Sequence, residues 1–247
     1  MRKPIIDITT TATLRPELLR VTLESFCRNL FKDVADCRLI INVDPVGGNC
    51  TQFEVLEVAR MFFRKVCYSI PKNAGFPEAF KWCWEQVEAP WVFNLEEDWE
   101  LLHDVDLIKM ITIMEETPHL CSLRLPASPA GNGSIKCWNL FFPWNGSFYE
   151  CPIEKVMSVG FCGHPSLLRG EFVKRCAPHI DVRMNPEKQF HRGPRPIMTA
   201  VSEGRFGVHA TAGDPPAIRD IGRKWMIQNG WMKEGNRAFF TQWKKVQ

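Results

Sequence analysis

The first hundred residues alternate between short runs of strand-forming residues and amphipathic helical segments. Residues 4–12, 37–48, 67–70 and 90–98 have the apolar, β-branched character of buried strands. Between them, residues 16–31, 51–66 and 77–87 repeat apolar side chains at helical spacing. Strands that alternate with helices form a parallel sheet with right-handed crossovers. The sequence therefore predicts an α/β domain with a mostly parallel central sheet flanked by helices. Later in the chain, residues 154–180 are predicted to form a strand, a turn, a second strand and a helix.

Polar residues stand where each of these strands ends. In chain order they are Thr10, Thr11 and Thr13, then Asp44, then Asn73, then Glu96–Asp98. Ligands of parallel sheets bind beyond the carboxyl ends of the strands. We therefore expect these side chains to converge on one crevice, although they are far apart in sequence.

The fourth strand runs directly into a cluster of acids: Glu96, Glu97, Asp98, Glu100, Asp104 and Asp106. Such a run is either a solvated loop, a set of acids near a helix N-terminus, or a site for a divalent cation. Mg²⁺ and Mn²⁺ prefer carboxylate oxygens and share their remaining positions with phosphate oxygens and water. A buried strand places its terminal acids on the floor of the crevice, and this context favours the cation site.

Charge is distributed unevenly along the chain. Residues 1–162 hold 16 Lys and Arg against 21 Asp and Glu, a net charge of −5, whereas residues 163–247 hold 15 against 7, a net of +8. The basic last third is either an ordinary solvated surface or a surface that meets an anion.

The composition is that of a soluble globular protein in a reducing compartment. No segment approaches the roughly 20 apolar residues of a membrane helix, and the N-terminus lacks a secretory apolar region. The ten cysteines form no CxxC pair and no metal-binding spacing. We expect a cytoplasmic location, which would be the host cytoplasm for a viral protein.

Several motifs together resemble glycosyltransferases of the GT-A (Rossmann-like) fold. They are "IIDITTTATLRPELLRVTLESF", "LIINVDP", "NAGFPEAFKWCWE", "LEED" in the place of the DXD metal motif, and "GHPSLLRGEFVKR" followed by "NPEKQFHR". The resemblance covers roughly residues 4–210. It implies one domain over residues 1–247, with a nucleotide-sugar half (1–125), an acceptor half (126–213) and a basic, Trp-rich C-terminal segment (214–247).

The resemblance also implies a binding site for a nucleotide-sugar donor, most simply a UDP-sugar. Its donor-binding residues would be Thr10, Thr11, Thr13, Arg15, Asp44, Asn73, Gly75, Glu96, Arg219, Arg223 and Lys224. Asp98, helped by His209, would hold Mn²⁺ or Mg²⁺. Asp44 has an alternative role in starting a turn at Pro45, and His209 an alternative role as a histidine at the end of a strand.

The general base of an inverting reaction would be Glu187, with Asp181 and Glu171 as rivals. Glu187 follows Pro186 and the helix-capping residue Asn185, so its alternative role is that of a first-turn helix acid.

The acceptor is inferred from the last third of the chain. Cations interleaved with Trp225, Trp231 and Trp243 are typical of nucleic-acid binding, and the alternative is a C-terminal helix whose tryptophans pack on the sheet. The arrangement resembles phage-type DNA-base glycosyltransferases, which modify a hydroxymethylpyrimidine. Acceptor-binding residues would be Trp138, Trp144, His164, Arg192 and Arg195. A glycan, lipid or protein acceptor, a nucleotidyltransferase and a non-enzymatic nucleic-acid-binding protein are the alternatives.

Overall fold

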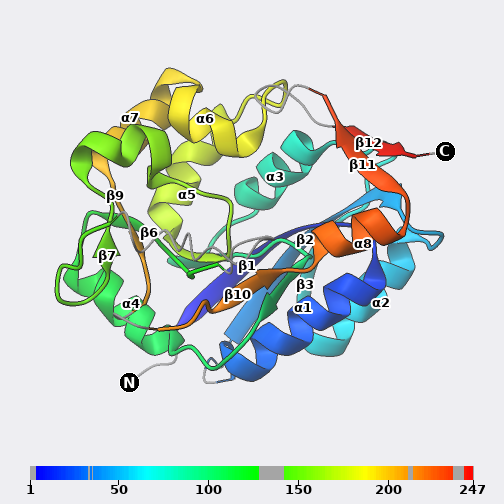
Figure 1. Cartoon of the computed structure of the whole chain (residues 1–247), viewed down its shortest axis with the longest axis horizontal. Coiled ribbons are helices and arrows are strands. Elements are labelled where there is room, and N and C mark those ends of the chain that lie inside the picture. The colour runs from blue at the N-terminus through cyan, green and yellow to red at the C-terminus, as the bar shows by residue number, and fades with distance from the viewer. Residues whose placement is uncertain are drawn as a thin grey trace.

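The computed structural model describes residues 4–32, 34, 36–127, 142–210, 214–235 and 242–246. Its centre is an eight-stranded sheet in the order β3-β2-β1-β4-β8-β6-β9-β7 (Figure 1). The strands are β1 (Ile5–Leu14), β2 (Asp36–Gly47), β3 (Lys65–Ser69), β4 (Trp91–Asn94), β6 (Leu120–Arg124), β7 (Tyr149–Glu150), β8 (Ser166–Arg169) and β9 (Arg205–Val208).

The first four sheet strands are parallel, as the sequence predicts. Their crossovers are the helices α1 (Pro16–Asn29), α2 (Gln52–Phe62) and α3 (Phe76–Glu85). Pro16 occupies the first turn of α1, where a missing N–H costs nothing. Thr51 and Glu54 form a capping box that fixes the start of α2. Local signals therefore explain most boundaries in this half.

The second half of the sheet is mixed. Strand β8 runs antiparallel to β4 and β6, β6 runs parallel to β9, and β7 runs antiparallel to β9. The helices here are α4 (Leu107–Glu116), α5 (Gly170–Cys176), α6 (Pro186–Arg192) and α7 (Arg195–Glu203). The single, mostly parallel α/β domain predicted from the sequence is confirmed.

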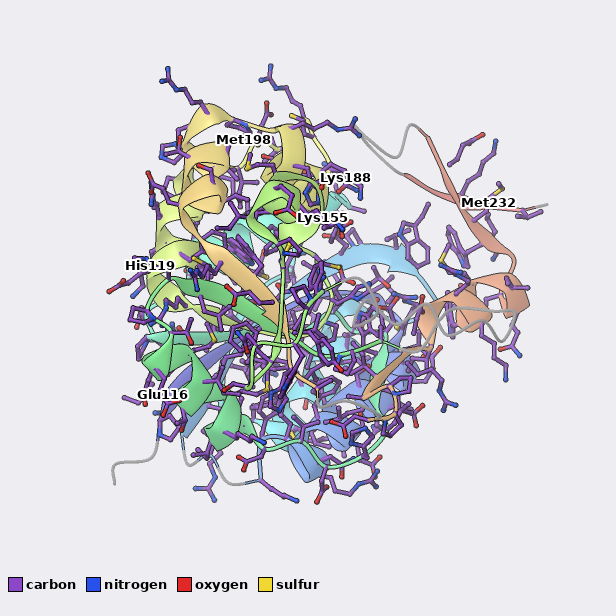
Figure 2. All side chains as sticks on the ribbon, turned by 60° about the vertical axis from the view of Figure 1, so that its left-hand side comes forward. Glu116, His119, Lys155, Lys188, Met198 and Met232 are labelled. Carbon is purple, nitrogen blue, oxygen red and sulfur yellow. The ribbon has the colours of Figure 1, made fainter. Side chains whose placement is uncertain are left out.

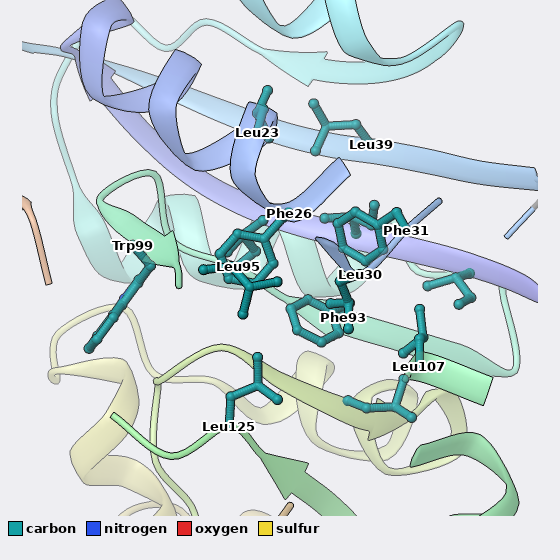
Figure 3. Packing of buried hydrophobic residues seen from close by; sticks show 14 of the residues in the cluster. Leu23, Phe26, Leu30, Phe31, Leu39, Phe93, Leu95, Trp99, Leu107 and Leu125 are labelled. Atoms are coloured by element: carbon teal, nitrogen blue, oxygen red, sulfur yellow. The ribbon is translucent and has the colours of Figure 1, made fainter. Parts of the chain in front are cut away.

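Buried side chains form one core on each face of the sheet. Ile6, Ile8 and Phe93 meet α1, α2 and α4 on one face, and Figure 3 shows the ring of Phe93 beside Phe26 and Phe31. On the other face, Val92 and Leu168 meet α3, α5 and α7. Because successive strand residues point to opposite faces, β4 and β8 each supply residues to both cores.

A second, two-stranded sheet brings the C-terminal segment to the acid run. Strand β5 (Trp99–Leu101) pairs with β10 (Ile218–Asp220), so that Arg219 lies opposite Glu100. The chain continues through the short helix α8 (Gly222–Gln228) into the hairpin β11 (Trp231–Glu234) and β12 (Gln242–Lys245). Figure 2 shows Met232 on this hairpin, set apart from the main body. The C-terminal segment is thus not the single amphipathic helix considered as an alternative.

One local prediction is wrong. The sequence suggests a strand near residues 154–160, but the chain forms a 3-10 turn (Ile153–Lys155) followed by a π-helical turn (Val156–Gly160). Val156 and Gly160, four residues apart, are both buried, and Gly160 packs closely on Phe206. A short apolar run does not distinguish a buried strand from a helical turn.

Among the described residues, no helix has the length and apolarity needed to cross a membrane. The cysteines described by the structure are free thiols. Burial raises the pKa of Cys27 and of Cys162 to about 12, so both behave as small apolar side chains at neutral pH.

Candidate functional site

The carboxyl ends of β1 and β4 lie side by side and bring the threonine run to the acid run. Thr9 is paired with Asn94 in the parallel register, and Leu95 donates its backbone N–H to Thr9. Four residues later, Thr13 donates both its backbone N–H (2.8 Å) and its hydroxyl (2.7 Å) to the Glu97 carboxylate. The convergence expected between these two strand ends is therefore found.

A buried arginine supplies the positive charge among the acids. Arg15 is only 3% exposed and donates from Nε to Glu97 Oε1 at 2.8 Å. Burial raises the pKa of Glu97, and the protonated Arg15 guanidinium opposes that rise. With its Thr13 contacts, Glu97 has enough partners to remain buried as a carboxylate.

The same guanidinium also reaches Asp98. Arg15 Nη2 donates to Asp98 Oδ2 at 3.1 Å, and the Asp98 side chain is 22% exposed. Asp98 is thus the acid of the pair that solvent and a ligand can reach, whereas Glu97 is enclosed.

The C-terminal segment lies over this cluster. The Arg15 guanidinium carbon is 4.8 Å from the centre of the Trp243 ring and 5.4 Å from that of Trp225. Trp225 also donates its indole N–H to Glu17, and Ile221 donates its backbone N–H to the Asp98 carbonyl at 2.9 Å. These contacts attach α8 and the hairpin to the crevice formed by β1 and β4.

A small pocket opens beside the threonines. It is lined by Thr9, Thr10, Thr11, Asn94, Leu95 and Glu96, with Phe80, Cys83 and Trp84 from α3. The buried Thr10 hydroxyl has no hydrogen-bond partner within the described protein. A polar ligand group that entered this pocket would satisfy it.

Two carboxylates from opposite halves of the chain meet at Gly163. Gly163 donates its backbone N–H to Glu187 Oε1 at 3.4 Å, and a β-carbon at this glycine would lie 3.8 Å from Glu96 Oε1. Glu96 comes from the end of β4, and Glu187 from the first turn of α6, which Asn185 caps. The loop before β8 therefore separates an acid of the predicted donor half from an acid of the predicted acceptor half.

Glu187 has the charge state required of a base. Burial acts to raise its pKa, but Lys188, 3.2 Å away, together with His164 and the hydrogen bond from the Gly163 N–H, outweighs that effect, and the net shift is downward. The side chain is 34% exposed, so an acceptor hydroxyl can approach it.

His164 stands in the same loop against Trp99, with ring centres 4.8 Å apart. Burial, assisted by the charge of Arg124, lowers the pKa of His164 to about 4. The ring is therefore neutral at physiological pH, and its Nδ1 is buried without a partner among the described residues.

Asp44 and Gly75 are brought together as the sequence suggests. Gly75 donates its backbone N–H to Asp44 Oδ2 at 3.0 Å, and Asn42 donates to Oδ1 at 2.8 Å. Burial raises the pKa of Asp44. Asn73, two residues before Gly75, is exposed on the loop that follows β3.

Metal binding would depend on few protein ligands. Among the described residues, no group of three His, Cys, Asp or Glu side chains is placed to hold a metal ion. One partly exposed carboxylate, Asp98, fits a Mg²⁺-type cation that takes its remaining ligands from phosphate and water. The charged groups that act on His209 are Lys109, Asp106 and Asp214, and burial lowers its pKa to about 4.

The two rival bases lie outside this cluster. Asp181 is held by Arg183, whose hydrogen bonds lower the pKa of Asp181 to about 2. Glu171 is exposed in the first turn of α5. Neither has a contact with Glu96, Glu187 or Gly163 in the described part of the chain.

The remaining residues of the sequence prediction lie at the surface or beyond the description. Arg219 pairs with Glu100 on β5. Trp144 packs on Tyr149 and is 41% exposed. Arg192, Arg195, Arg223 and Lys224 are exposed, and Trp138 lies outside the described residues.

Several residues of the site have no individual role in the sequence analysis, among them Glu97, Trp99, Gly163 and Gly222, which packs against the Asp98 carboxylate. A signal for Glu97 exists. Trp91, Phe93 and Leu95 alternate into the core, and the same period of two points position 97 inward. A buried acid requires a buried cation, which makes an arginine such as Arg15 its natural partner.

Solved structures share this fold at low sequence identity. S. aureus TarS matches with a TM-score of 0.59 and 12% sequence identity, over 87% of this chain and 36% of TarS. TarS 1–349 in complex with UDP-GlcNAc matches with a TM-score of 0.57 and 13% identity, over 87% of this chain and 58% of TarS 1–349. The mannosyltransferase PcManGT from Pyrobaculum calidifontis, in complex with GDP-Man and Mn²⁺, matches with a TM-score of 0.57 and 8% identity, over 93% of this chain and 61% of PcManGT.

The chain thus spans less than two thirds of the length of each of these structures. No protein-family model matches its sequence, and no curated protein matches it either. These likenesses establish a GT-A-type fold.

Proposed function

We propose that the chain is a metal-dependent glycosyltransferase that moves a sugar from a nucleotide-diphosphate donor to an acceptor hydroxyl. The observation that carries the proposal is the approach of Glu96 and Glu187 to the same loop residue, Gly163, because it brings an acid of each predicted half close to the other. The neighbours with bound UDP-GlcNAc, and with GDP-Man and Mn²⁺, support a nucleotide-sugar donor and a divalent cation.

Each group of residues has a distinct task in this proposal. Thr10, Thr11 and Asp44 surround the nucleoside, next to the Gly75 backbone. Asp98 holds the cation, which when bound offsets the negative charge that develops on the departing diphosphate. Glu187 accepts the proton of the attacking hydroxyl. The exposed cations Arg219, Arg223 and Lys224 lie on the segment next to Asp98 and would add positive charge beside the phosphates.

Ligand-dependent stability tests the donor site directly. UDP, with GDP in parallel, should raise the melting temperature by about 5 °C when Mn²⁺ is present at saturating ligand. Without Mn²⁺ the rise should be much smaller. Asp98→Ala should remove the metal-dependent part, whereas Asp104→Ala should keep it, because Asp104 is an exposed acid of the same run that pairs with Lys32. Equal responses in the two variants would contradict the proposed role of Asp98.

For the acceptor, we propose a 5-hydroxymethylpyrimidine in DNA. The exposed cations of the last third, including Arg192 and Arg195, support an anionic partner. The tryptophans give less support to base stacking, since Trp225 is buried and the rings of Trp231 and Trp243 contact one another.

The acceptor is tested with a panel of nucleotide sugars and two DNA substrates. Hydroxymethylated and unmodified DNA are incubated with each donor, and the nucleosides are analysed by mass spectrometry. A sugar-sized mass increase on the hydroxymethylated nucleoside alone supports the DNA acceptor. Donor turnover with an unchanged nucleoside profile would instead favour a glycan, lipid or protein acceptor.

A further inference from the structure

Arg15 contacts two acids whose environments differ. It binds Glu97 through Nε and Nη2 and also donates from Nε to the Thr13 hydroxyl at 2.9 Å. It binds Asp98 through one longer contact of 3.1 Å. The Glu97 side chain is 2% exposed, and the Asp98 side chain is 22% exposed. The contact with Asp98 is therefore the one that can open while Glu97 continues to hold the arginine.

We propose that Arg15 is a positioning residue that holds the Asp98 carboxylate in place of a cation and makes cation binding depend on the nucleotide. The inference rests on the proposed function, in which Asp98 contacts the metal. In the protein without nucleotide, the guanidinium competes with the cation for the same carboxylate. A nucleotide diphosphate brings negative charge that compensates the positive charges of both the Arg15 guanidinium and the metal ion.

The surroundings keep Arg15 from moving away. The rings of Trp225 and Trp243 cover the guanidinium, and Glu97 is itself fixed by two hydrogen bonds from Thr13. The positive charge consequently stays near Asp98 whether or not a metal is present. A cation that binds without phosphate meets this charge at close range and binds weakly.

The dependence of Mn²⁺ binding on the nucleotide is a thermodynamic coupling between the two ligands. If UDP raises the affinity for Mn²⁺, Mn²⁺ must raise the affinity for UDP by the same factor. Removing the Arg15 charge should increase the affinity for Mn²⁺ alone and so reduce the coupling. A purely structural arginine predicts the opposite direction, since its loss would disorder the acids and weaken metal binding.

The test is a Mn²⁺ titration followed by electron paramagnetic resonance, without and with UDP, on the full chain. Arg15→Met combined with Glu97→Gln removes both charges and leaves no unpaired buried acid. We expect this variant to bind Mn²⁺ without UDP about tenfold more tightly than the wild type, the factor that corresponds to one charged hydrogen bond. Arg15→Lys, which keeps the charge but loses the fork geometry, should fall between the two.

A matched control removes the same two charges from an exposed pair. Arg60→Met with Glu57→Gln changes an ion pair on α2 whose side chains are 43% and 68% exposed, and its Mn²⁺ affinity should equal that of the wild type. Circular dichroism verifies that each variant is folded. If the double variant at Arg15 does not fold, Arg15→Lys against the wild type carries the same comparison.

The outcomes separate this inference from the function on which it rests. Unchanged Mn²⁺ affinity in the Arg15 variants, together with UDP–Mn²⁺ binding that still requires Asp98, would overturn the role of Arg15 alone. UDP–Mn²⁺ binding that survives Asp98→Asn, or is absent from the wild type, would overturn the proposed function and this inference with it. Tighter Mn²⁺ binding that Asp98→Asn abolishes supports both.

Discussion

At the scale of single residues, two of the buried acids, Asp7 and Glu97, are paired with arginines, whereas Asp44 is held by Asn42 and the Gly75 backbone. Asp7 is 2% exposed and binds Arg38 through both carboxylate oxygens at 2.9 Å, while Oδ2 also accepts from the backbone of Glu88 and Ala89. Burial acts to raise the pKa of Asp7, but these hydrogen bonds outweigh it, and the net shift is downward. Glu97 and Arg15 repeat the arrangement at the site. For these two acids, burial therefore goes with an arginine nearby.

The pair Glu187–Lys188 gives a prediction on pH dependence. Lys188 is the charge that lowers the pKa of Glu187, so Lys188→Gln should raise that pKa. With Glu187 as the base, activity is lost as the pH falls through this pKa. The acid limb of kcat/KM for nucleotide-sugar hydrolysis should then move to higher pH.

The control for this shift is Lys32→Gln, which changes the net charge equally at an exposed pair with Asp104. Its acid limb should match that of the wild type. An unmoved limb in Lys188→Gln would show that a group other than Glu187 controls the rate.

At the scale of elements, the C-terminal segment has the least predictable structure. One of the two sequence alternatives holds that its tryptophans pack on the sheet from a single helix. They do pack, but against Arg15 and against one another, and they belong to a short helix and a hairpin. The pairing of β10 with β5 sets this position, because it lays Arg219 beside Glu100 and leads directly into α8. The segment thereby becomes one wall of the proposed donor site.

Gly222, the first residue of α8, gives a prediction in which helix propensity and packing disagree. Alanine favours a helix by about 1 kcal/mol over glycine. A β-carbon here, however, would lie 2.0 Å from Asp98 Oδ2. We expect packing to dominate, so that Gly222→Ala lowers the melting temperature and greatly reduces the Mn²⁺-dependent stabilisation by UDP.

The comparison variant is Gln228→Ala, at the exposed end of the same helix. It gains helix propensity without meeting Asp98, so its melting temperature and UDP response should be at least those of the wild type. A Gly222→Ala protein with a normal UDP response would mean that α8 does not touch Asp98.

At the scale of the whole molecule, one sheet joins the two halves that the sequence divides at residue 125. Strands β4 and β8 form one junction, where Trp91 is paired with Arg169, and β6 of the first half lies between β8 and β9 of the second. Gly170, which follows Arg169, lies so close to the chain just before β4 that a β-carbon would be 2.1 Å from the Ala89 carbonyl oxygen. The predicted assignment of the halves as one domain implies that they unfold together.

Denaturation tests this prediction. The transitions followed by far-ultraviolet circular dichroism and by tryptophan fluorescence should coincide. Gly170→Ala should shift both by the same amount, corresponding to about 2 kcal/mol of lost stability. Glu171→Ala, at the exposed neighbouring position, should change neither by more than about 0.5 kcal/mol. Separate transitions would show that the halves are independent units.

The sequence by itself determined the alternation of strands and helices in the first half of the chain and the positions of those strand ends. Apolar periodicity, Pro16, the Thr51–Glu54 box and the Asn185 cap act over a few residues, so they can be read without knowing what lies nearby in space. The convergence of Thr13 with the acid run, of Asp44 with Gly75, and of Glu96 with Glu187 follows from those strand ends and the helix start they lead to.

Only the tertiary structure decided which charges meet. Arg15 and Glu97 are 82 residues apart in sequence, and Arg219 and Glu100 are 119 apart. No local pattern encodes such pairs, since they depend on which strands become neighbours and how the C-terminal segment returns to them. The cation among the acids is accordingly an arginine contributed by the turn after β1, and the tryptophans of the basic tail cover it.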